Sequence, residues 1–472
     1  MKKRTGRISY DYTNMLSPAV GTRHGVTPGE LRAWKTRAET AAADVRRRHE
    51  SGEMEFISLP SRMKTAREIA EFARRAKNDF DDFVVLGIGG SALGAAALHC
   101  ALNPPYYNLM SVRRRMGYPR FFVEDNVDPV RIANLLEVVN PKRTLFNVIT
   151  KSGGTAETLA ALLTVCGMIR RKTGRNALPK HLVATTDGEK GNLREIVRRE
   201  KLPSFEVPRG VGGRFSVLTP VGLVPAAMTG INVIQLLRGA AAMRARCIAA
   251  DAGSNPALLS ALLQFLACTK KGKTIQVMMP YSVQLYFLAD WYRQLWAESL
   301  GKRFDLAGRT VNAGQTPVKA LGATDQHSQI QLYAEGPNDK TITFLRVEKF
   351  GTDVEIPKGF DDLDGLSYLG GASFSELLNT ELRGTEIALT KAKRPNSTFV
   401  FPAITPFTVG QFIFLLEMQT VFAGGLFRVN PFDQPGVEAG KIAAFALMGR
   451  RGFEKNLEEI SALESRLPRK VV

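Results

Sequence analysis

Short runs of apolar residues alternate with longer segments whose apolar positions recur every three or four residues. In the first half of the chain this pattern predicts strands at 83–88, 121–124, 146–150 and 181–186, with helices from about 91 and at 130–139 and 155–171. Continuous apolar strands that alternate with helices are typical of a parallel sheet covered on both faces. The pattern therefore predicts a doubly wound α/β domain.

The same rhythm restarts in the second half of the chain. After helical stretches at 221–243 and 255–269, we expect a strand at 274–279, a helix at 281–299 and strands at 330–333 and 342–345. We interpret the fold as α/β, with two doubly wound domains packed together and helical segments at both ends. The predicted boundaries are a helical N-terminal arm at 1–77, domains at 78–240 and 241–450, and a helical tail at 451–472.

Length and composition agree with a cytoplasmic α/β enzyme. A chain of 472 residues exceeds one ordinary domain, and we expect no apolar stretch long enough to span a bilayer. Four widely spaced cysteines, without a C-x-x-C pair, are expected to be buried free thiols; they are Cys100, Cys166, Cys247 and Cys268. Too few ligand-type side chains lie at suitable spacing to propose a metal site, and no cofactor is expected.

The charge balance is unusual, because 64 Lys and Arg against 45 Asp and Glu give a net charge of +19. A positive field concentrates anionic substrates. The alternative is nucleic-acid binding, but the basic clusters are scattered and lack interleaved aromatic residues for base stacking. We therefore expect no nucleic-acid partner, and the sequence assigns no role to the basic surplus.

Two glycine-rich segments each follow an apolar run and open an amphipathic one. They are Leu86–Gly94 (L-G-I-G-G-S-A-L-G) and Thr150–Thr155 (T-K-S-G-G-T). Glycine lets the backbone approach an anion, hydroxyl groups donate to its oxygens, and a helix N-terminus supplies free N–H groups. Neither segment has the spacing of a dinucleotide or P-loop motif. They predict a small phosphoester ligand, although ordinary strand-to-helix turns also look like this.

Several single residues are candidates for chemistry. Arg214 stands beside two glycines and could project into a cleft, and Glu298 ends an apolar helix where a partly desolvated carboxylate could act as a base. Taken alone, however, Arg214 fits a surface salt bridge and Glu298 a solvated carboxylate. His327 lies in a polar turn where Asp325 or a carbonyl could orient the ring.

Six motifs occur in a fixed order: G-I-G-G-S, K-S-G-G-T-x-E-T, G-G-R-F-S, E-S-x-G-K, D-Q-H-S-Q and N-x-F-D-Q-x-G-V-E-x-G-K. Together they resemble the glucose-6-phosphate isomerase (phosphoglucose isomerase) family of the bacterial type, from about Phe83 to Lys441. The resemblance implies two flavodoxin-like, SIS-type domains. It also implies the reversible conversion of glucose 6-phosphate and fructose 6-phosphate through a cis-enediolate, in glycolysis and gluconeogenesis.

The resemblance also implies roles for matching residues. Glu298 corresponds to the base that moves a proton between C1 and C2, Arg214 to the cation that stabilises the enediolate, and His327 and Lys441 to the pair that opens the sugar ring. Positions that hold substrate are matched by Gly90, Ser91, Thr150, Lys151, Ser152, Thr155, Gly213 and Gln434. The family forms homodimers with shared active sites, in which the histidine matching His327 reaches the neighbouring subunit's site.

Two further readings stay open at this point. A dual phosphoglucose/phosphomannose isomerase would use the same chemistry. A non-catalytic sugar-phosphate-binding protein would keep the phosphate loop but would have no reason to keep Glu298, Arg214, His327 and Lys441 together.

Overall fold

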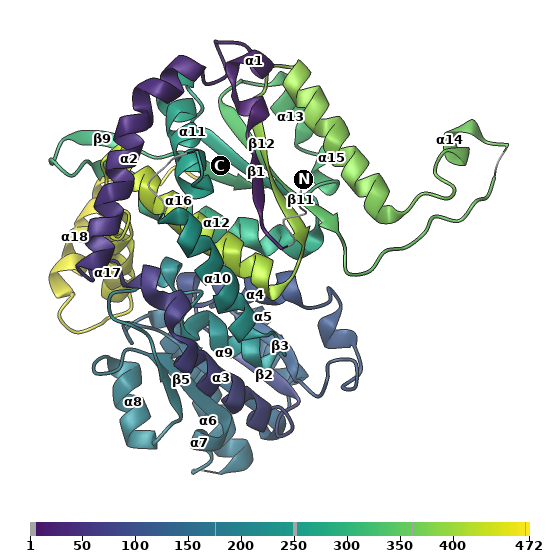
Figure 1. Cartoon of the computed structure of the whole chain (residues 1–472). Coiled ribbons are helices and arrows are strands. Elements are labelled where there is room, and N and C mark those ends of the chain that lie inside the picture. The colour runs from purple at the N-terminus through teal and green to yellow at the C-terminus, as the bar shows by residue number, and fades with distance from the viewer. Residues whose placement is uncertain (1–5, 175, 249–252, 361, 468) are drawn as a thin grey trace.

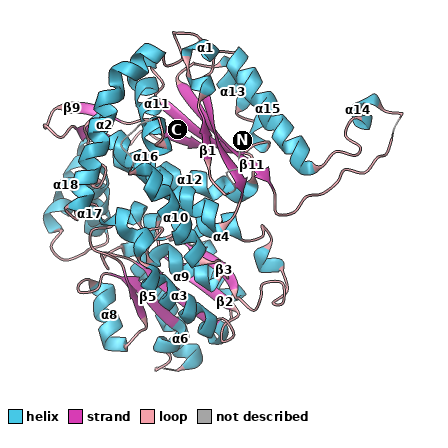
Figure 2. Cartoon of the chain, viewed as in Figure 1, coloured by secondary structure: helices cyan, strands magenta, loops and turns pink. Residues whose placement is uncertain are grey.

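The computed structural model describes residues 6–174, 176–248, 253–360, 362–467 and 469–472. It contains two five-stranded sheets, one in the lower and one in the upper half of Figure 1, with helices between and around them. Figure 2 shows the strands as two separate groups enclosed by helices. This is the predicted arrangement of two α/β domains packed together.

The first sheet is entirely parallel and has the order β3-β2-β4-β5-β6. Numbered by appearance within the sheet, the order is 2-1-3-4-5, which is the flavodoxin-like order. Its strands are β2 (Asp82–Leu86), β3 (Arg120–Glu124), β4 (Thr144–Ile149), β5 (Leu182–Thr186) and β6 (Ser204–Glu206). The four strands predicted in this half lie within two residues of β2, β3, β4 and β5.

The second sheet has the order β1-β12-β11-β7-β10, parallel except for β1 at one edge. Its strands are β7 (Ile275–Pro280), β10 (Thr316–Lys319), β11 (Lys340–Lys349), β12 (Asn396–Ala403) and β1 (Ser9–Asp11). A small separate ribbon pairs β8 (Lys302–Phe304) with β9 (Thr310–Ala313). The edge strand β1 comes from the N-terminal arm, which therefore contributes a strand as well as helices.

The strand expected at 330–333 was wrong, because these residues open helix α13 (Ile330–Glu335). Tyr333 packs into the core beside Ile330, three positions earlier, whereas Leu332 is 56% exposed. Core-facing residues three positions apart are typical of a helix. The short apolar run at 330–333 was compatible with a strand, because so few residues do not distinguish the two.

Helices form a shared central layer between the sheets and outer layers beyond them. One apolar core joins the inner faces of both sheets to α3 (Met63–Ala76), α4 (Leu93–Leu102), α9 (Pro220–Met228), α10 (Val233–Cys247), α11 (Pro256–Lys271), α12 (Tyr286–Leu300) and α16 (Pro406–Phe427). The outer face of the first sheet packs on α5 (Pro129–Val138), α6 (Ala156–Thr173), α7 (Leu178–His181) and α8 (Asn192–Glu200). The outer face of the second packs on α13 and α15 (Phe374–Lys391). Because the inner core is common, the two domains are fixed to each other.

The remaining elements lie at the edges of this body. They are α1 (Ser17–Val20), α2 (Pro28–Glu50), α14 (Asp364–Ser367), α17 (Glu438–Leu447) and α18 (Glu454–Arg466). In Figure 1 the segment that carries α14 extends away from the body between β11 and α15. All four cysteines are free as expected, but Cys100 and Cys268 are only partly buried.

Among the described residues, one helix is long and apolar enough to cross a membrane, so the expectation of none was wrong. This helix is α16, whose most apolar window is 94% buried against other parts of the chain. It packs against α2, α10, α11 and α12. It has the position of a core helix, which explains why it is apolar on every side.

The close crossing of α10 and α16 depends on glycine. A Cβ atom at Gly239 would lie 1.9 Å from the carbonyl oxygen of Phe407, and one at Gly410 would lie 2.0 Å from that of Leu236. Neither gap admits a methyl group, so the two helix backbones can approach only because both positions lack a side chain.

We therefore predict that Gly239→Ala lowers the free energy of unfolding by about 1–3 kcal/mol, measured by urea denaturation. The matched control is Gly384→Ala, at an exposed position of α15 with no atom near the added methyl group. It should raise stability by up to about 1 kcal/mol, because alanine is the better helix former. Equal effects of the two substitutions would contradict the close-packing explanation.

Candidate functional site

The two predicted glycine-rich loops lie where strands of the first sheet end. The 3₁₀ turn η3 (Gly89–Ser91) follows β2, and its backbone meets that of a second 3₁₀ turn, η6 (Gly213–Phe215). A Cβ atom at Gly90 would lie 2.4 Å from the carbonyl carbon of Gly213. The contact requires glycine at residue 90, and it places the first loop directly beside Arg214.

The second loop connects β4 to the N-terminus of α6. Thr150 is buried, and its hydroxyl lies 3.2 Å from that of Thr155, the N-cap residue of α6. The Thr155 side chain makes no capping hydrogen bond. The first backbone N–H groups of α6 can therefore donate hydrogen bonds to an anion. Ser152 is exposed, and its hydroxyl oxygen accepts a 3.3 Å hydrogen bond from the Gly154 amide.

Lys151 joins this loop to the segment that leads to Arg214. Its ammonium group donates to the carbonyl oxygens of Arg209 and Val211, at 2.6 and 2.9 Å. Burial lowers the pKa of Lys151. Its side chain therefore holds two loops together.

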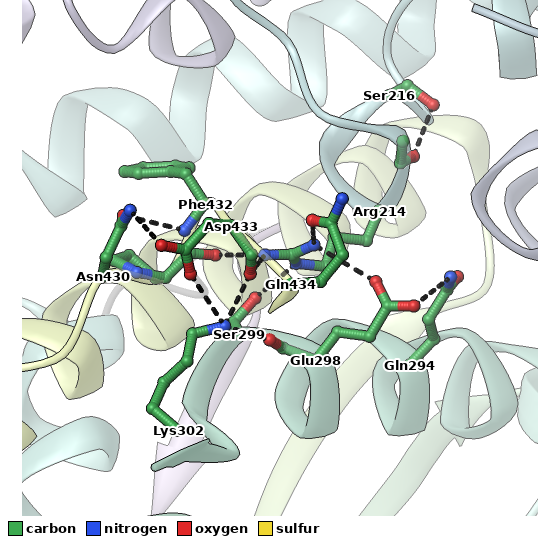
Figure 3. Close-up of polar contacts among 12 residues, drawn as sticks. Arg214, Ser216, Gln294, Glu298, Ser299, Lys302, Asn430, Phe432, Asp433 and Gln434 are labelled. Carbon is green, nitrogen blue, oxygen red and sulfur yellow. Dashed lines mark hydrogen bonds and ion pairs between the residues drawn. The ribbon is translucent and has the colours of Figure 1, made fainter. Parts of the chain in front are cut away.

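Arg214 is the centre of the polar cluster in Figure 3. Its side chain is 3% exposed, so the alternative of a surface salt bridge was wrong. All five of its N–H donors are used: Nε bonds Ser299 Oγ at 2.7 Å, one terminal nitrogen bonds Glu298 and Gln434, and the other bonds the carbonyl oxygens of Pro431 and Asp433. These acceptors come from two chain segments, the end of α12 and the loop at 430–434.

Glu298 lies in the last turn of α12 with its carboxylate toward Arg214. Its Oε2 is 3.1 Å from the guanidinium and its Oε1 accepts a 3.3 Å hydrogen bond from Gln294, one turn earlier. The side chain is 31% exposed. A carboxylate that is held on one side and open on the other can exchange a proton with a bound ligand.

Lys302 lies beneath this pair, four residues after Glu298. Its ammonium group donates to the main-chain carbonyl oxygens of Glu298 and Asp433, at 2.6 and 2.5 Å, and pairs with the Asp433 carboxylate at 3.2 Å. Figure 3 shows Lys302 and Arg214 converging on the Asp433 carbonyl group. Desolvation lowers the pKa of both Arg214 and Lys302. Both are thus buried cations held by fixed acceptors.

The structure brings Gly90, Gly213, Arg214, Glu298 and Gln434 together, and Lys151 ties the second glycine-rich loop to the segment that precedes Arg214. It does not bring His327 into this cluster. His327 ends the 3₁₀ turn η8 (Thr324–His327) and is exposed, and within the described chain no hydrogen bond or ion pair links it to Arg214 or Glu298. Asp325 does not orient its ring, because the Asp325 carboxylate accepts from the Leu321 amide and the Ser328 hydroxyl.

Lys441 also lies outside the cluster in this structure. It is half exposed on α17 and forms a 3.0 Å ion pair with Glu438 on the same helix. Helix α17 follows directly from the 3₁₀ turn η9 (Pro435–Val437), which begins at the residue after Gln434. Lys441 is therefore close to the site along the chain, without contacting Arg214 or Glu298 among the described contacts.

Residue-type reasoning missed Gln294, Ser299 and Lys302. Gln294 and Glu298 are four apart on one helix, so their contact follows a spacing that the sequence displays. Ser299 and Lys302 were visible within E-S-x-G-K, but nothing local shows that one would meet Arg214 and the other Asp433. No group of three or more metal-ligating side chains occurs among the residues described.

Comparison with known proteins gives one consistent result. The family model described as "Phosphoglucose isomerase" matches residues 59–457. A glucose-6-phosphate isomerase of Carboxydothermus hydrogenoformans is 48% identical over 456 residues, which cover 96% of this chain and 97% of that protein. One from Thermus thermophilus is 41% identical over 84% of this chain and 90% of its own length.

Solved structures agree on the fold. A hypothetical protein of Thermus thermophilus superposes with a TM-score of 0.83 at 37% identity, over 94% of this chain and all of that one. A glucose-6-phosphate isomerase of Chlamydia trachomatis superposes with a TM-score of 0.80 at 22% identity, over 97% of this chain and 92% of that one, and supports the fold alone. With the family model matching most of its length, the chain belongs to the phosphoglucose isomerase family.

Proposed function

We propose that this chain catalyses the reversible isomerisation of glucose 6-phosphate and fructose 6-phosphate through a cis-enediolate. The observation that carries the proposal is the contact between the Glu298 carboxylate and the buried Arg214 guanidinium beside the two glycine-rich loops. The names of the relatives point to the same reaction. A protein that only binds sugar phosphates would gain nothing from a base placed next to a fixed cation.

The proposed chemistry needs no oxidant or leaving group. Glu298 removes the proton from C2 of the open-chain aldose, and the electron pair forms the C1–C2 double bond while negative charge develops on the C1 oxygen. Within the enediolate the C2 hydroxyl proton passes to the C1 oxygen, which leaves the negative charge on the C2 oxygen. The carboxyl group then returns its proton to C1, and the C2 oxygen becomes the carbonyl oxygen of the ketose. The reverse sequence converts ketose to aldose.

Arg214 is proposed to stabilise the enediolate by its charge. Its five N–H donors are already occupied by protein acceptors, so it meets the intermediate as a fixed positive charge and not as a free donor. A preorganised charge of this kind costs no reorganisation when the anion forms.

The loop at Thr150–Thr155 is proposed to hold the phosphate group. Its hydroxyl groups and the open amides of α6 supply donors, and Lys151 supplies positive charge. Gly90, Ser91, Gly213 and Gln434 are proposed to contact the sugar, because η3 meets η6 beside Arg214 and Gln434 accepts a hydrogen bond from Arg214. Binding at the phosphate orients the carbon atoms that react.

We further propose a homodimer with shared active sites. His327 and Lys441 are both exposed, and two regions carry exposed apolar side chains that a second copy would cover. These lie on the α14 segment and on α17 and α18: Val354, Phe360, Leu363, Leu366, Tyr368, Leu447, Met448 and Leu463. In this proposal His327 reaches the site of the neighbouring subunit. There it opens the sugar ring together with that subunit's own Lys441. Cytoplasmic glycolysis and gluconeogenesis are the proposed setting.

Glu298→Gln should lower kcat by about 10²- to 10⁴-fold, because the amide cannot accept the carbon-bound proton. A coupled assay with fructose 6-phosphate measures the rate, with mannose 6-phosphate run beside it to test the dual isomerase. Binding of the non-reacting analogue glucitol 6-phosphate, measured by calorimetry, should change little. The control is Glu195→Gln, at an exposed glutamate of α8, which should turn over normally. Normal turnover by purified Glu298→Gln would remove Glu298 from its role.

Metal chelation should leave the rate unchanged, since the enediolate already has a cationic partner in Arg214. The measurement is the same coupled assay after dialysis against EDTA. An activity that disappears in EDTA and returns with a divalent ion would overturn the metal-free mechanism.

Mixing two inactive variants tests the shared site. A heterodimer of Glu298→Gln with His327→Ala contains one doubly defective site and one intact site. Refolding the two together should restore up to about one quarter of wild-type activity, because half of randomly paired dimers are heterodimers with one working site.

The matched control for this mixing experiment is Glu298→Gln with Lys441→Ala. Both residues are proposed to serve the same subunit's site, so every site in that mixture lacks one of them and no activity should return. If the Glu298→Gln and His327→Ala mixture stays inactive although heterodimers are shown to form, His327 acts within its own subunit.

A further inference from the structure

Lys302 stands out among the charged groups around the site, because it is nearly buried and its ammonium group is bonded to protein acceptors. Its side chain is 5% exposed, and its ammonium group is surrounded by the Glu298 carbonyl, the Asp433 carbonyl and the Asp433 carboxylate. Burying an ammonium group is costly unless its donors are satisfied. The contacts of the ammonium group must therefore compensate for the free energy that its burial costs.

The first contact of Lys302 completes the end of α12. The helix ends at Leu300, so the Glu298 carbonyl has no amide four residues later to bond within the helix. The Lys302 ammonium fills this place at 2.6 Å. A cation at a helix C-terminus also offsets the negative end of the helix dipole. Lys302 thus fixes the backbone of the residue that carries the proposed base.

The second contact reaches the loop that faces Arg214. The Asp433 carbonyl oxygen accepts from both Lys302 at 2.5 Å and Arg214 at 3.0 Å. The Asp433 carboxylate is held in turn by Asn430, at 2.8 Å. The next residue, Gln434, accepts from Arg214 through its side chain. One ammonium group therefore connects the helix of Glu298 to the loop that orients Arg214.

We propose that Lys302 is a positioning residue for isomerisation, which sets the Glu298–Arg214 pair through the backbone of Glu298 and the carbonyl of Asp433. The proposal rests on the proposed function, and it assigns Lys302 no contact with substrate. The charged groups around Lys302 are Arg214, Glu298 and Asp433.

The test is Lys302→Met, which keeps most of the side chain and removes the charge. We expect kcat to fall by about 10- to 100-fold with KM changed less than about threefold, as for a displaced catalytic group. Lys302→Arg should restore most of the lost kcat, because a guanidinium group can donate to the same two carbonyl oxygens.

The matched control is Lys340→Met. Lys340 is also nearly buried, 3% exposed, and donates to the Pro337 carbonyl and the Asp339 carboxylate at the start of β11. It should lower stability while kcat per folded enzyme stays as in the wild type. Lys302→Gln is the second variant if Lys302→Met fails to fold, since its amide can still donate to a carbonyl oxygen but carries no charge.

Unchanged kcat in folded Lys302→Met or Lys302→Gln would overturn the positioning role. The same would hold if Lys340→Met lowered kcat per folded enzyme equally, because the loss would then reflect stability alone. Failure of the proposed function is distinguishable, since in that case the wild-type protein itself would not isomerise fructose 6-phosphate.

Discussion

The burial of one guanidinium group organises the site. Arg214 has five donors and almost no access to water, so each donor needs an acceptor from the protein. Those acceptors are on α12 and on the loop at 430–434, more than 80 and 200 residues away along the chain. The group can be satisfied only when the end of the first domain, a central helix and the C-terminal loop are all in place. Substrate chemistry is therefore coupled to the packing of both domains.

The shared helical layer makes this convergence possible. The glycine contacts between α10 and α16 and between η3 and η6 bring backbones together at distances that a side chain would prevent. Close approach of this kind leaves little freedom for the loops that the helices carry. A base and a cation on separate elements can then be held near 3 Å without a bound ligand.

The sequence predicted the parts of the fold that depend on local pattern. In the first sheet β2, β3, β4 and β5 come from apolar runs, and these four predicted strands were confirmed. The short edge strand β6 is not such a run and was not predicted. The edge strand β1 has no such pattern and could not be predicted locally. It forms by pairing with β12, where Ser9 lies opposite Val400, far along the chain. The segment at 330–333 was misassigned because a short apolar run does not distinguish a strand from one helical turn.

The candidate site also contains residues that the sequence predicted and residues that it did not. Residue types alone favoured a surface role for Arg214, and only the ordered motifs of the family resemblance placed it with Glu298. Lys302 escaped both kinds of reasoning, since its acceptors are backbone carbonyl groups, which carry no sequence signature.

The charges around Glu298 explain why such a site favours an anionic intermediate. Two buried cations, Arg214 and Lys302, face two carboxylates, Glu298 and Asp433, so the cluster is balanced before substrate binds. The proposed proton transfer to Glu298 would neutralise one carboxylate and leave the cations in excess by one charge. Desolvation already lowers the pKa of both cations, which means that each is held at a cost. In the proposed mechanism the enediolate supplies the missing negative charge when Glu298 is protonated, so the intermediate would restore the charge balance of the ground state.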